Sequence, residues 1–392
     1  MDNLELLTFV SSQLAQLTEY YCLLFTAQIM SVPPPIESAL VVGGCGVLGH
    51  RMVTELLKLD PSPKIAVFDL RTAQNRVQSP SVEYHDVDIT DEEAVHAALR
   101  KVKPQVIFHT ASPPAGLLDL DLYLKVNVEG TRNLLEGAKQ AGTKAFVYTS
   151  SASVVHDAIS DLVEADDSLP LVYLPQQKEV YSHSKALADQ LVLDANSTTD
   201  GGMLTASIRP SGIFGEDEGS AKSLAESAAA GKLKVQIGTG TNLFDFTYIE
   251  NVIHAHILAA QSLLENKDRA SGEKGAAGEG FIITNDEHIP FWEFARAIGD
   301  AAGYPTNRKD VRTIPKFAGL MMAAIAEWVV WLTSFGRKKS HMNTVGIRYS
   351  CMTRTYRIDK AKKILGYRPI VTLQEGILRS GKSFLTQSKK TA

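Results

Sequence analysis

The sequence predicts an α/β protein, with a doubly wound parallel sheet and a smaller lobe contributed by the C-terminal part of the chain. Short apolar segments alternate with amphipathic segments of helical length from residue 39 to about residue 210. This alternation is typical of βαβ units, whose strands run parallel. Beyond Gly215 the rhythm loosens, but residues 245–264 and 281–286 are expected to return to the same sheet. The 392 residues, 44% of them hydrophobic, suffice for such a sheet and an attached lobe.

The elements can be assigned in order along the chain. Strands are expected at 39–44, 64–70, 105–111, 144–151 and 204–210, and helices at 50–59, 91–102, 121–141 and 180–195. The predicted organisation is an amphipathic extension over 1–36, a main domain over 37–215 with 244–286 returning to it, and a smaller lobe mainly from 216–392.

Composition excludes several classes of function. A net charge of −4 provides no basic surface for nucleic acid. The three cysteines, Cys22, Cys45 and Cys351, lie far apart and show no metal-ligand spacing. We therefore expect reduced thiols in a cytosol-like medium and no metal site.

Two segments bear on membranes. Residues 1–35 lack Lys and Arg, which argues against a targeting peptide. Their apolar side chains recur at helical spacing, so they predict an amphipathic helix that docks on the protein, lies on a membrane, or precedes the native start at Met30. Residues 317–335 contain one charge, Glu327, and are followed by Arg337, Lys338 and Lys339. This segment predicts a buried helix of the smaller lobe or, as we favour, a monotopic membrane anchor.

A glycine-rich turn predicts a dinucleotide site. Gly43, Gly46 and Gly49 form GxxGxxG between a predicted strand and a predicted helix. The first glycine permits the tight turn, the second the approach of a pyrophosphate, and the third close packing of helix on strand. Asp69 ends the next strand, where a carboxylate would bind the ribose diol of NAD, although Arg71 leaves NADP open. We therefore predict a Rossmann-like domain, and we interpret Cys45 in the loop as a packing residue.

A second group of residues predicts proton transfer. Ser150 and Ser151 follow a strand, and Tyr181 and Lys185 lie one turn apart on the next helix. The Lys185 ammonium and an oxidised nicotinamide would both lower the pKa of the phenol, while Ser151 binds the substrate oxygen. Alone, the Tyr–Lys pair would be an ordinary solvated helix face; beside a dinucleotide site it indicates a catalytic base. His183 is interpreted as a spectator.

These motifs resemble the extended short-chain dehydrogenase/reductase superfamily and, within it, the 3β-hydroxysteroid dehydrogenase family, most of all its sterol-4α-carboxylate 3-dehydrogenases (decarboxylating). The resemblance covers about residues 37–380 and is carried by HTASPP (109–114), VNVEGTRNLL (126–135), VYTSSASVV (147–155), YSHSK (181–185), RPSGIFG (209–215), 236–261, FIITND (281–286) and 361–377.

The resemblance implies roles for particular residues. It implies a catalytic set of Ser151, Tyr181 and Lys185, with Asn127 supporting a proton-relay water. It also implies a cofactor site formed by Gly43, Gly46, Val47, Leu48, Gly49, Asp69, Asp88, Ile89, Thr110, Ala111 and Pro210, together with Tyr181 and Lys185. Where relatives commonly have Gly before the adenine-side Asp, this chain has Val87. The long N-terminal extension is a second departure.

The implied activity is NAD-dependent oxidation of the 3β-hydroxyl of a 4α-carboxysterol, with loss of the carboxylate as CO₂. The implied setting is the cytoplasmic face of the endoplasmic reticulum membrane or the lipid droplet, as a homodimer or with other sterol-demethylation enzymes. A steroid dehydrogenase/isomerase and a specialised triterpenoid dehydrogenase remain alternatives. A catalytically idle dinucleotide sensor or a membrane scaffold would not need the serine, tyrosine and lysine together. Arg209, which ends a strand, is a candidate partner for the substrate carboxylate, though a structural role is favoured.

Overall fold

The computed structural model describes residues 34–265, 275–335, 340 and 342–391. The predicted amphipathic helix in the N-terminal extension and the basic triplet at 337–339 lie outside these residues. The chain divides into Met1–Pro34 and Pro35–Ala392, and the description below concerns the second unit.

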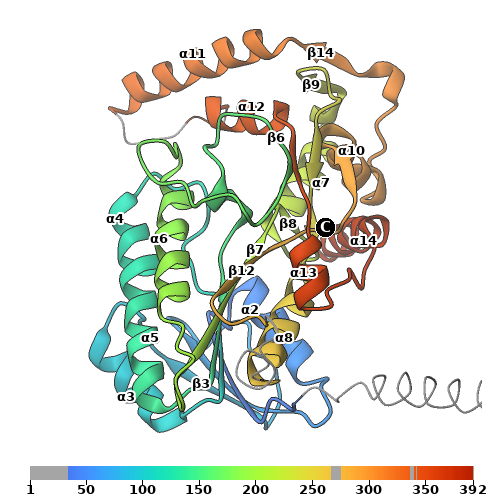
Figure 1. Cartoon of the computed structure of the whole chain (residues 1–392). Helices are drawn as coiled ribbons and strands as arrows, with labels where there is room; N and C mark the ends of the chain where they lie inside the picture. The colour runs from blue at the N-terminus through green and yellow to red at the C-terminus, as the bar shows by residue number, and fades with distance from the viewer. Residues whose placement is uncertain (1–33, 266–274, 336–339, 341, 392) are drawn as a thin grey trace, which may run out of the picture. The chain divides into compact units, whose positions relative to one another are not determined.

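A seven-stranded sheet forms the centre of this unit, and all of its strands run parallel (Figure 1). In spatial order they are β12 (Glu279–Ile283), β7 (Leu204–Pro210), β5 (Ala145–Thr149), β4 (Val106–His109), β1 (Ser38–Val42), β2 (Lys64–Asp69) and β3 (Val82–Asp86). The order reverses between β1 and β4, the point at which open α/β sheets bind ligands beyond the carboxyl ends of their strands. The predicted doubly wound α/β class is confirmed.

Helices cover both faces of the sheet because successive strand residues point to opposite sides. Leu40 and Val42 pack with α3 (Glu92–Val102), α5 (Gly130–Ala141) and α6 (Val180–Asp194). Val41, between them, packs instead with α2 (Val47–Leu56) and α8 (Ile249–Glu265). The strands are buried on both faces, which explains why they are continuous apolar runs in the sequence.

The smaller lobe has its own four-stranded sheet, in the order β13 (His288–Pro290), β10 (Leu243–Asp245), β15 (Arg354–Tyr356) and β6 (Leu162–Ala165). Two short pairs accompany it: β11 (Thr247–Tyr248) with β8 (Ile213–Phe214), and β14 (Arg312–Ile314) with β9 (Val235–Ile237). The remaining helices are α4 (Leu120–Tyr123), α7 (Gly219–Ala229), α10 (Phe291–Ala301), α11 (Lys316–Ser334), α12 (Thr344–Cys351), α13 (Asp359–Ile364) and α14 (Leu373–Thr391). The segment 245–264 is therefore divided between lobe strands and a helix on the main sheet.

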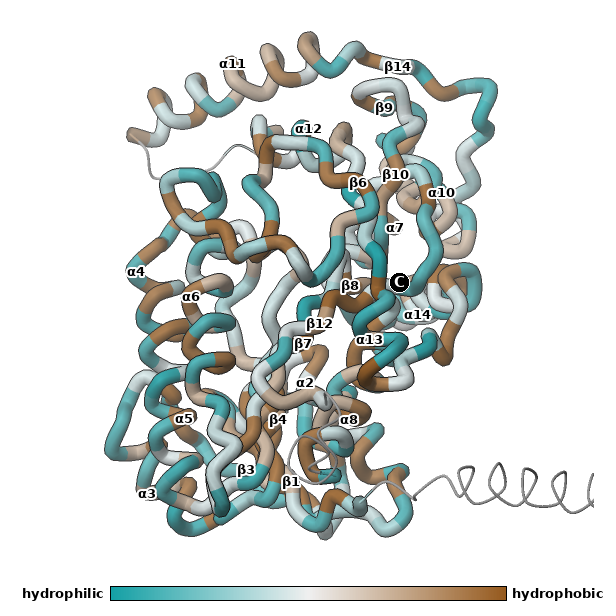
Figure 2. Tube along the Cα trace, viewed as in Figure 1, coloured by the Kyte–Doolittle hydropathy of each residue, from teal (hydrophilic) through white to brown (hydrophobic). Residues whose placement is uncertain are grey.

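Helix α11 corresponds to the predicted apolar segment and lies at one edge of the lobe, beside α12 (Figure 1). Among the described residues it is the helix that is long and apolar enough to cross a membrane. Only 11% of its most apolar stretch is buried inside the protein. Only Gly319 and Ala323 are fully buried, and Figure 2 shows apolar residues along most of its length. Glu327 accepts a hydrogen bond from the Thr344 backbone N–H at 2.9 Å, which ties α11 to α12. The alternative of a buried lobe helix is wrong.

Candidate active site

The glycine turn after β1 has the geometry that a dinucleotide requires. Gly43 has a φ of +83°, and a Cβ there would lie 2.8 Å from the Ala111 backbone. A Cβ on Gly49 would lie 2.1 Å from the Gly43 carbonyl oxygen, so a side chain would force helix and strand apart. Helix α2 begins after Gly46 with no side-chain cap, which leaves its first backbone N–H groups available for phosphate oxygens. The residues of this turn therefore fit the pyrophosphate of a dinucleotide.

Asp69 is held beside this turn at the end of β2. Its carboxylate accepts hydrogen bonds from the backbone N–H of Cys45 at 3.0 Å and of Arg71 at 3.4 Å. Burial, followed by the charge of Asp69, raises the pKa of the Cys45 thiol to about 11. Cys45 is therefore a neutral packing residue, as expected, and the Asp69 carboxylate is held in place at the end of β2.

The other residues assigned to the cofactor lie along the same edge. Ile89 is packed so closely on α5 that a Cβ on Gly130 would lie 2.7 Å from its Cγ1. The Thr110 hydroxyl donates to the Val42 carbonyl at 2.8 Å. Three more residues line the carboxyl edge of the sheet or the first turn of α2: Val47, Leu48 and Pro210. Asp88 is exposed, and its carboxylate accepts the Thr90 N–H of its own turn at 2.9 Å.

Lys185 is almost completely buried, with 2% of its surface exposed. Its Nζ donates to the Thr149 carbonyl at 2.8 Å and lies 4.8 Å from the centre of the Tyr148 ring. Burial lowers the pKa of Lys185 to about 7. The lysine is therefore fixed at the end of β5, where burial disfavours its charged form.

Tyr181 begins α6, and its ring packs edge-on against Tyr123 with centroids 5.6 Å apart. Burial raises the pKa of Tyr181, and neighbours including Tyr123 and Glu179 raise it further, while Arg354 opposes them. The predicted lowering of this pKa by Lys185 and an oxidised nicotinamide concerns the protein with its cofactor bound; in the chain alone, desolvation is the largest effect and raises the pKa. In this state Tyr181 is protonated.

Ser151 is linked to α6 through hydroxyl groups. Its Oγ lies 2.8 Å from Ser153 Oγ, which in turn lies 2.9 Å from Ser182 Oγ. The strand-end serine and the residue beside Tyr181 therefore belong to one hydrogen-bonded group.

Asn127 approaches the same helix from the opposite side. It lies in a π-helical turn, Leu124–Glu129, and is 1% exposed. Its Nδ2 donates to Ser184 Oγ at 2.9 Å, and that hydroxyl donates to the Tyr181 carbonyl at 2.8 Å. Its Oδ1 is buried with no partner in the described part of the chain. The structure thus brings the serine, tyrosine, lysine and asparagine together.

Two residues considered for the site have structural partners instead. Arg209 binds Asp189 of α6 through Nε at 3.0 Å and Nη2 at 2.7 Å, and both side chains are buried. It is therefore not free for a substrate carboxylate. His183 accepts the Leu174 backbone N–H at its Nδ1 and packs against Tyr173, which agrees with a spectator role.

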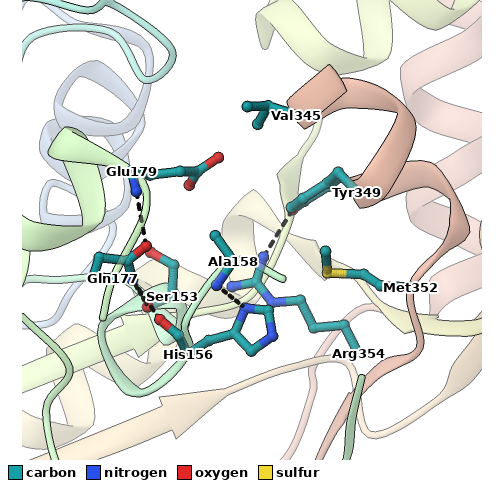
Figure 3. Close-up of a pocket in the computed structure, with 9 residues that line it drawn as sticks. All are labelled: Ser153, His156, Ala158, Gln177, Glu179, Val345, Tyr349, Met352 and Arg354. Carbon is teal, nitrogen blue, oxygen red and sulfur yellow. Dashed lines mark hydrogen bonds between the residues drawn. The ribbon is translucent and has the colours of Figure 1, made fainter. Parts of the chain in front are cut away.

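Sequence reasoning missed a cavity near the start of α6 and beside α12, whose lining residues are drawn in Figure 3. Its lining comes from segments far apart in the chain: Ser153, His156, Ala158, Gln177, Glu179, Val345, Tyr349, Met352 and Arg354. No single segment carries a residue spacing that would predict this cavity. It becomes recognisable only in the fold, through its position beside Ser151 and Tyr181.

The fold and the glycine turn together define an oxidoreductase with a nicotinamide dinucleotide site. The sequence profile of the 3-beta hydroxysteroid dehydrogenase/isomerase family matches residues 40–313, and the chain belongs to that family.

Several curated relatives match nearly the full length of the chain. The sterol-4-alpha-carboxylate 3-dehydrogenase, decarboxylating, of Saccharomyces cerevisiae is 35% identical over 349 residues, which cover 87% of this chain and 96% of that protein. The mouse (Mus musculus) protein of the same name is 36% identical over 350 residues, 89% and 91% of the two chains. The 3beta-hydroxysteroid-dehydrogenase/decarboxylase isoform 1 of Arabidopsis thaliana is 35% identical over 369 residues, 91% and 81%.

Solved structures share the fold at lower identity. An epimerase of Methanothermobacter thermautotrophicus has a TM-score of 0.67 and 19% identity, covering 90% of this chain and 94% of its own. The Thermus thermophilus UDP-glucose 4-epimerase, solved with NAD, has a TM-score of 0.63 and 21% identity, covering 88% and 98%. These likenesses establish the fold.

Proposed function

We propose that the protein oxidises the 3β-hydroxyl of a 4α-carboxysterol to the ketone and that the C4 carboxylate then leaves as CO₂. The observation that carries this proposal is the convergence of Ser151, Tyr181, Lys185 and Asn127 beyond the glycine turn, in a chain whose full-length relatives bear that activity in their names.

Each side chain has one part in the oxidation. The Ser151 hydroxyl binds the C3 oxygen, and Tyr181 accepts its proton. Bound NAD would accept hydride from C3 and would place a positive charge near the phenol that favours its ionisation. Lys185 holds the end of β5 against α6 and passes the proton onward, with Asn127 orienting the relay.

Loss of CO₂ follows from the position of the new ketone. A carboxylate on C4 is β to a carbonyl at C3, so the C4–carboxyl bond can break with its electrons moving into the carbonyl as an enolate. The protonated Tyr181 phenol then donates a hydrogen bond, or its proton, to the enolate oxygen. No metal or lysine imine has to enter this sequence.

The preferred cofactor is NAD. Asp69 is oriented by two backbone N–H groups at the end of β2, where it would bind a ribose diol and repel a 2′-phosphate. Val47, Leu48, Gly46 and the other residues along the carboxyl edge of the sheet would surround the dinucleotide, with Asp88 and Ile89 on its adenine side.

Helix α11 is proposed as a monotopic anchor that places the protein on the cytoplasmic face of the endoplasmic reticulum or on a lipid droplet. Trp328 and Trp331 are 63% and 60% exposed, and Phe317 and Ile325 are 72% and 57% exposed. A run of large exposed apolar side chains of this kind is suited to the headgroup–acyl boundary. The charge that would oppose insertion, Glu327, is turned toward Thr344. A sterol substrate resides in the same layer.

The test is product analysis by mass spectrometry with NAD and a panel of 3β-hydroxysterols that carry or lack a 4α-carboxylate. The proposal predicts a 3-ketone smaller than the acid by CO₂ and two hydrogens. A conjugated enone from a Δ5 steroid would instead support the dehydrogenase/isomerase alternative, and turnover confined to triterpenoid acids would support the specialised one.

A further inference from the structure

Arg354 is a buried guanidinium without an anionic partner. It begins β15 and is 4% exposed. Its Nε donates to the Tyr356 hydroxyl at 2.7 Å and its Nη1 to the Tyr349 hydroxyl at 3.1 Å. Within the described residues no carboxylate oxygen lies within 4.0 Å of it. The two tyrosines fix its orientation but do not neutralise its charge.

Other buried arginines of this protein are paired. Arg209 binds Asp189 at 2.7 Å, and Arg296 binds Glu293 at 2.7 Å. A buried charge that lacks a partner costs several kcal/mol. Arg354 instead lies among three aromatic rings, those of Phe244, Tyr349 and Tyr356, whose centroids are 5.6, 5.4 and 5.7 Å from its Cζ. An anionic ligand would add the charged partner that the other two arginines have.

The guanidinium lines the cavity next to the proposed catalytic group (Figure 3). Ser153, on the same lining, is hydrogen-bonded to Ser151 at 2.8 Å, and Glu179 directly precedes the helix that carries Tyr181. Arg354 is close enough to Tyr181 for its charge to oppose the rise in the pKa of that phenol. The cavity volume is about 10 Å³, room for roughly one water molecule and far below the roughly 300–1,000 Å³ of pockets that enclose a whole ligand. It therefore has room for a single polar atom of a larger molecule, such as one carboxylate oxygen.

We propose that Arg354 is the receptor for the carboxylate at C4 of the substrate, a specificity-determining and positioning role that rests on the proposed function. C3 and C4 are bonded neighbours, so a substrate whose 3-hydroxyl lies at Tyr181 and Ser151 carries its carboxylate only a few ångströms away. The planar guanidinium binds carboxylates through parallel hydrogen bonds. Its Nη2 makes no hydrogen bond within the described residues and is available for such a pair.

The charges around the cavity predict whether each substitution weakens or strengthens the binding of an anionic substrate. Glu179 is the carboxylate among the lining residues, and its Oε2 accepts a hydrogen bond from Ser182 Oγ at 3.2 Å. His156 is neutral, because burial and then Arg354 lower its pKa, and its ring nitrogens bind Ser160 and Ala158. Arg354 therefore attracts an anionic substrate and Glu179 repels it, so removing one charge has the opposite effect to removing the other.

The role affects binding more than the chemical step. CO₂ is neutral, so the ion pair weakens as the C4–carboxyl bond breaks and gives no stabilisation specific to that transition state. An interaction made in the ground state appears in KM.

The experiment compares a 4α-carboxy-3β-hydroxysterol with the same sterol bearing a 4α-methyl group, with NADH formation as the readout. Wild type should prefer the acid. Arg354→Gln should lose roughly 10- to 100-fold in kcat/KM for the acid, mainly through KM, with little change for the methyl compound. Arg354→Lys should restore part of the preference, and Glu179→Gln should lower KM for the acid. Arg357→Gln is the matched control, because Arg357 is an exposed arginine that binds Asp166.

Three results would overturn the inference. Retained preference for the acid in Arg354→Gln would do so, and so would an equal loss on both sterols, which indicates a structural role. If Arg354→Gln does not fold, unchanged acid kinetics in both Arg354→Lys and Glu179→Gln would overturn it. A wild-type enzyme that oxidises the methyl sterol but not the acid would instead refute the proposed function, and the inference with it.

Discussion

Lys185 has a proton affinity that differs between the folded and the unfolded chain. Its pKa is about 7 in the folded protein, against an ordinary 10.5, because burial opposes the ammonium. Between these two values the unfolded chain binds more protons, so this residue makes folding stability rise with pH. Below pH 7 the lysine is charged in both states and its desolvation cost is fully present.

Replacement of Lys185 by methionine should remove this pH dependence. We expect the difference in free energy of unfolding, wild type minus Lys185→Met, to increase by about 1.4 kcal/mol per pH unit between pH 7 and 10. Urea unfolding at several pH values measures the difference. A constant difference between the two proteins across this range would show that Lys185 is not desolvated in the folded state.

Asp69 is the residue that we expect to decide between NAD and NADP. Asp69→Asn keeps the shape but removes the charge that favours a ribose diol, so KM for NAD should rise about 10- to 100-fold while KM for NADP falls. Initial rates with both cofactors test this. If the ratio of the two KM values does not change, Asp69 lies away from the ribose.

Helix α6 carries Tyr181 and Lys185, and the Asp189–Arg209 ion pair attaches it to β7. Arg209→Leu leaves Asp189 buried and unpaired, which should cost about 3–5 kcal/mol of unfolding free energy. The double variant Asp189→Leu, Arg209→Leu should recover most of that loss in urea unfolding. Equal destabilisation of the single and double variants would mean that lost packing, and not the unpaired charge, sets the cost.

Helix α11 is predicted to bind membranes through its exposed apolar side. Ile325→Asp combined with Trp328→Asp should lower the partition coefficient onto anionic phospholipid vesicles at least about tenfold, with activity on detergent-dispersed substrate retained. Flotation with vesicles measures it. Ile370→Asp, at another exposed apolar residue (60% exposed), is the control and should bind as wild type does. Undiminished flotation of the double variant would assign membrane binding to another part of the chain.

At the scale of the whole molecule, the local sequence pattern was sufficient to predict some features of the structure and not others. The βαβ rhythm and the turn at Gly43, Gly46 and Gly49 predicted the sheet because strand, turn and helix are neighbours in sequence. The rise in the pKa of the Tyr181 phenol in the chain alone comes first from burial, and Tyr123, from a distant segment, adds to it. Arg209 was a candidate carboxylate partner for which a structural role was favoured, and only the fold shows that its partner is Asp189.

The cavity at Arg354 was beyond sequence reasoning for the same reason. Ser153, Glu179, Tyr349 and Arg354 are brought together by β15 of the lobe sheet, α12 and the start of α6. No spacing links them, and an arginine between two threonines has the composition of an ordinary exposed strand. Its significance comes from its burial and from the absence of a carboxylate partner in the described part of the chain.

The most direct test of the account measures NADH and CO₂ together from a 4α-carboxysterol labelled in its carboxyl group. Wild type should release the two products in a 1:1 ratio, and Tyr181→Phe should lose roughly 10²- to 10⁴-fold in both while still binding NAD. NADH formed without CO₂, or a Tyr181→Phe variant as active as wild type, would contradict the account.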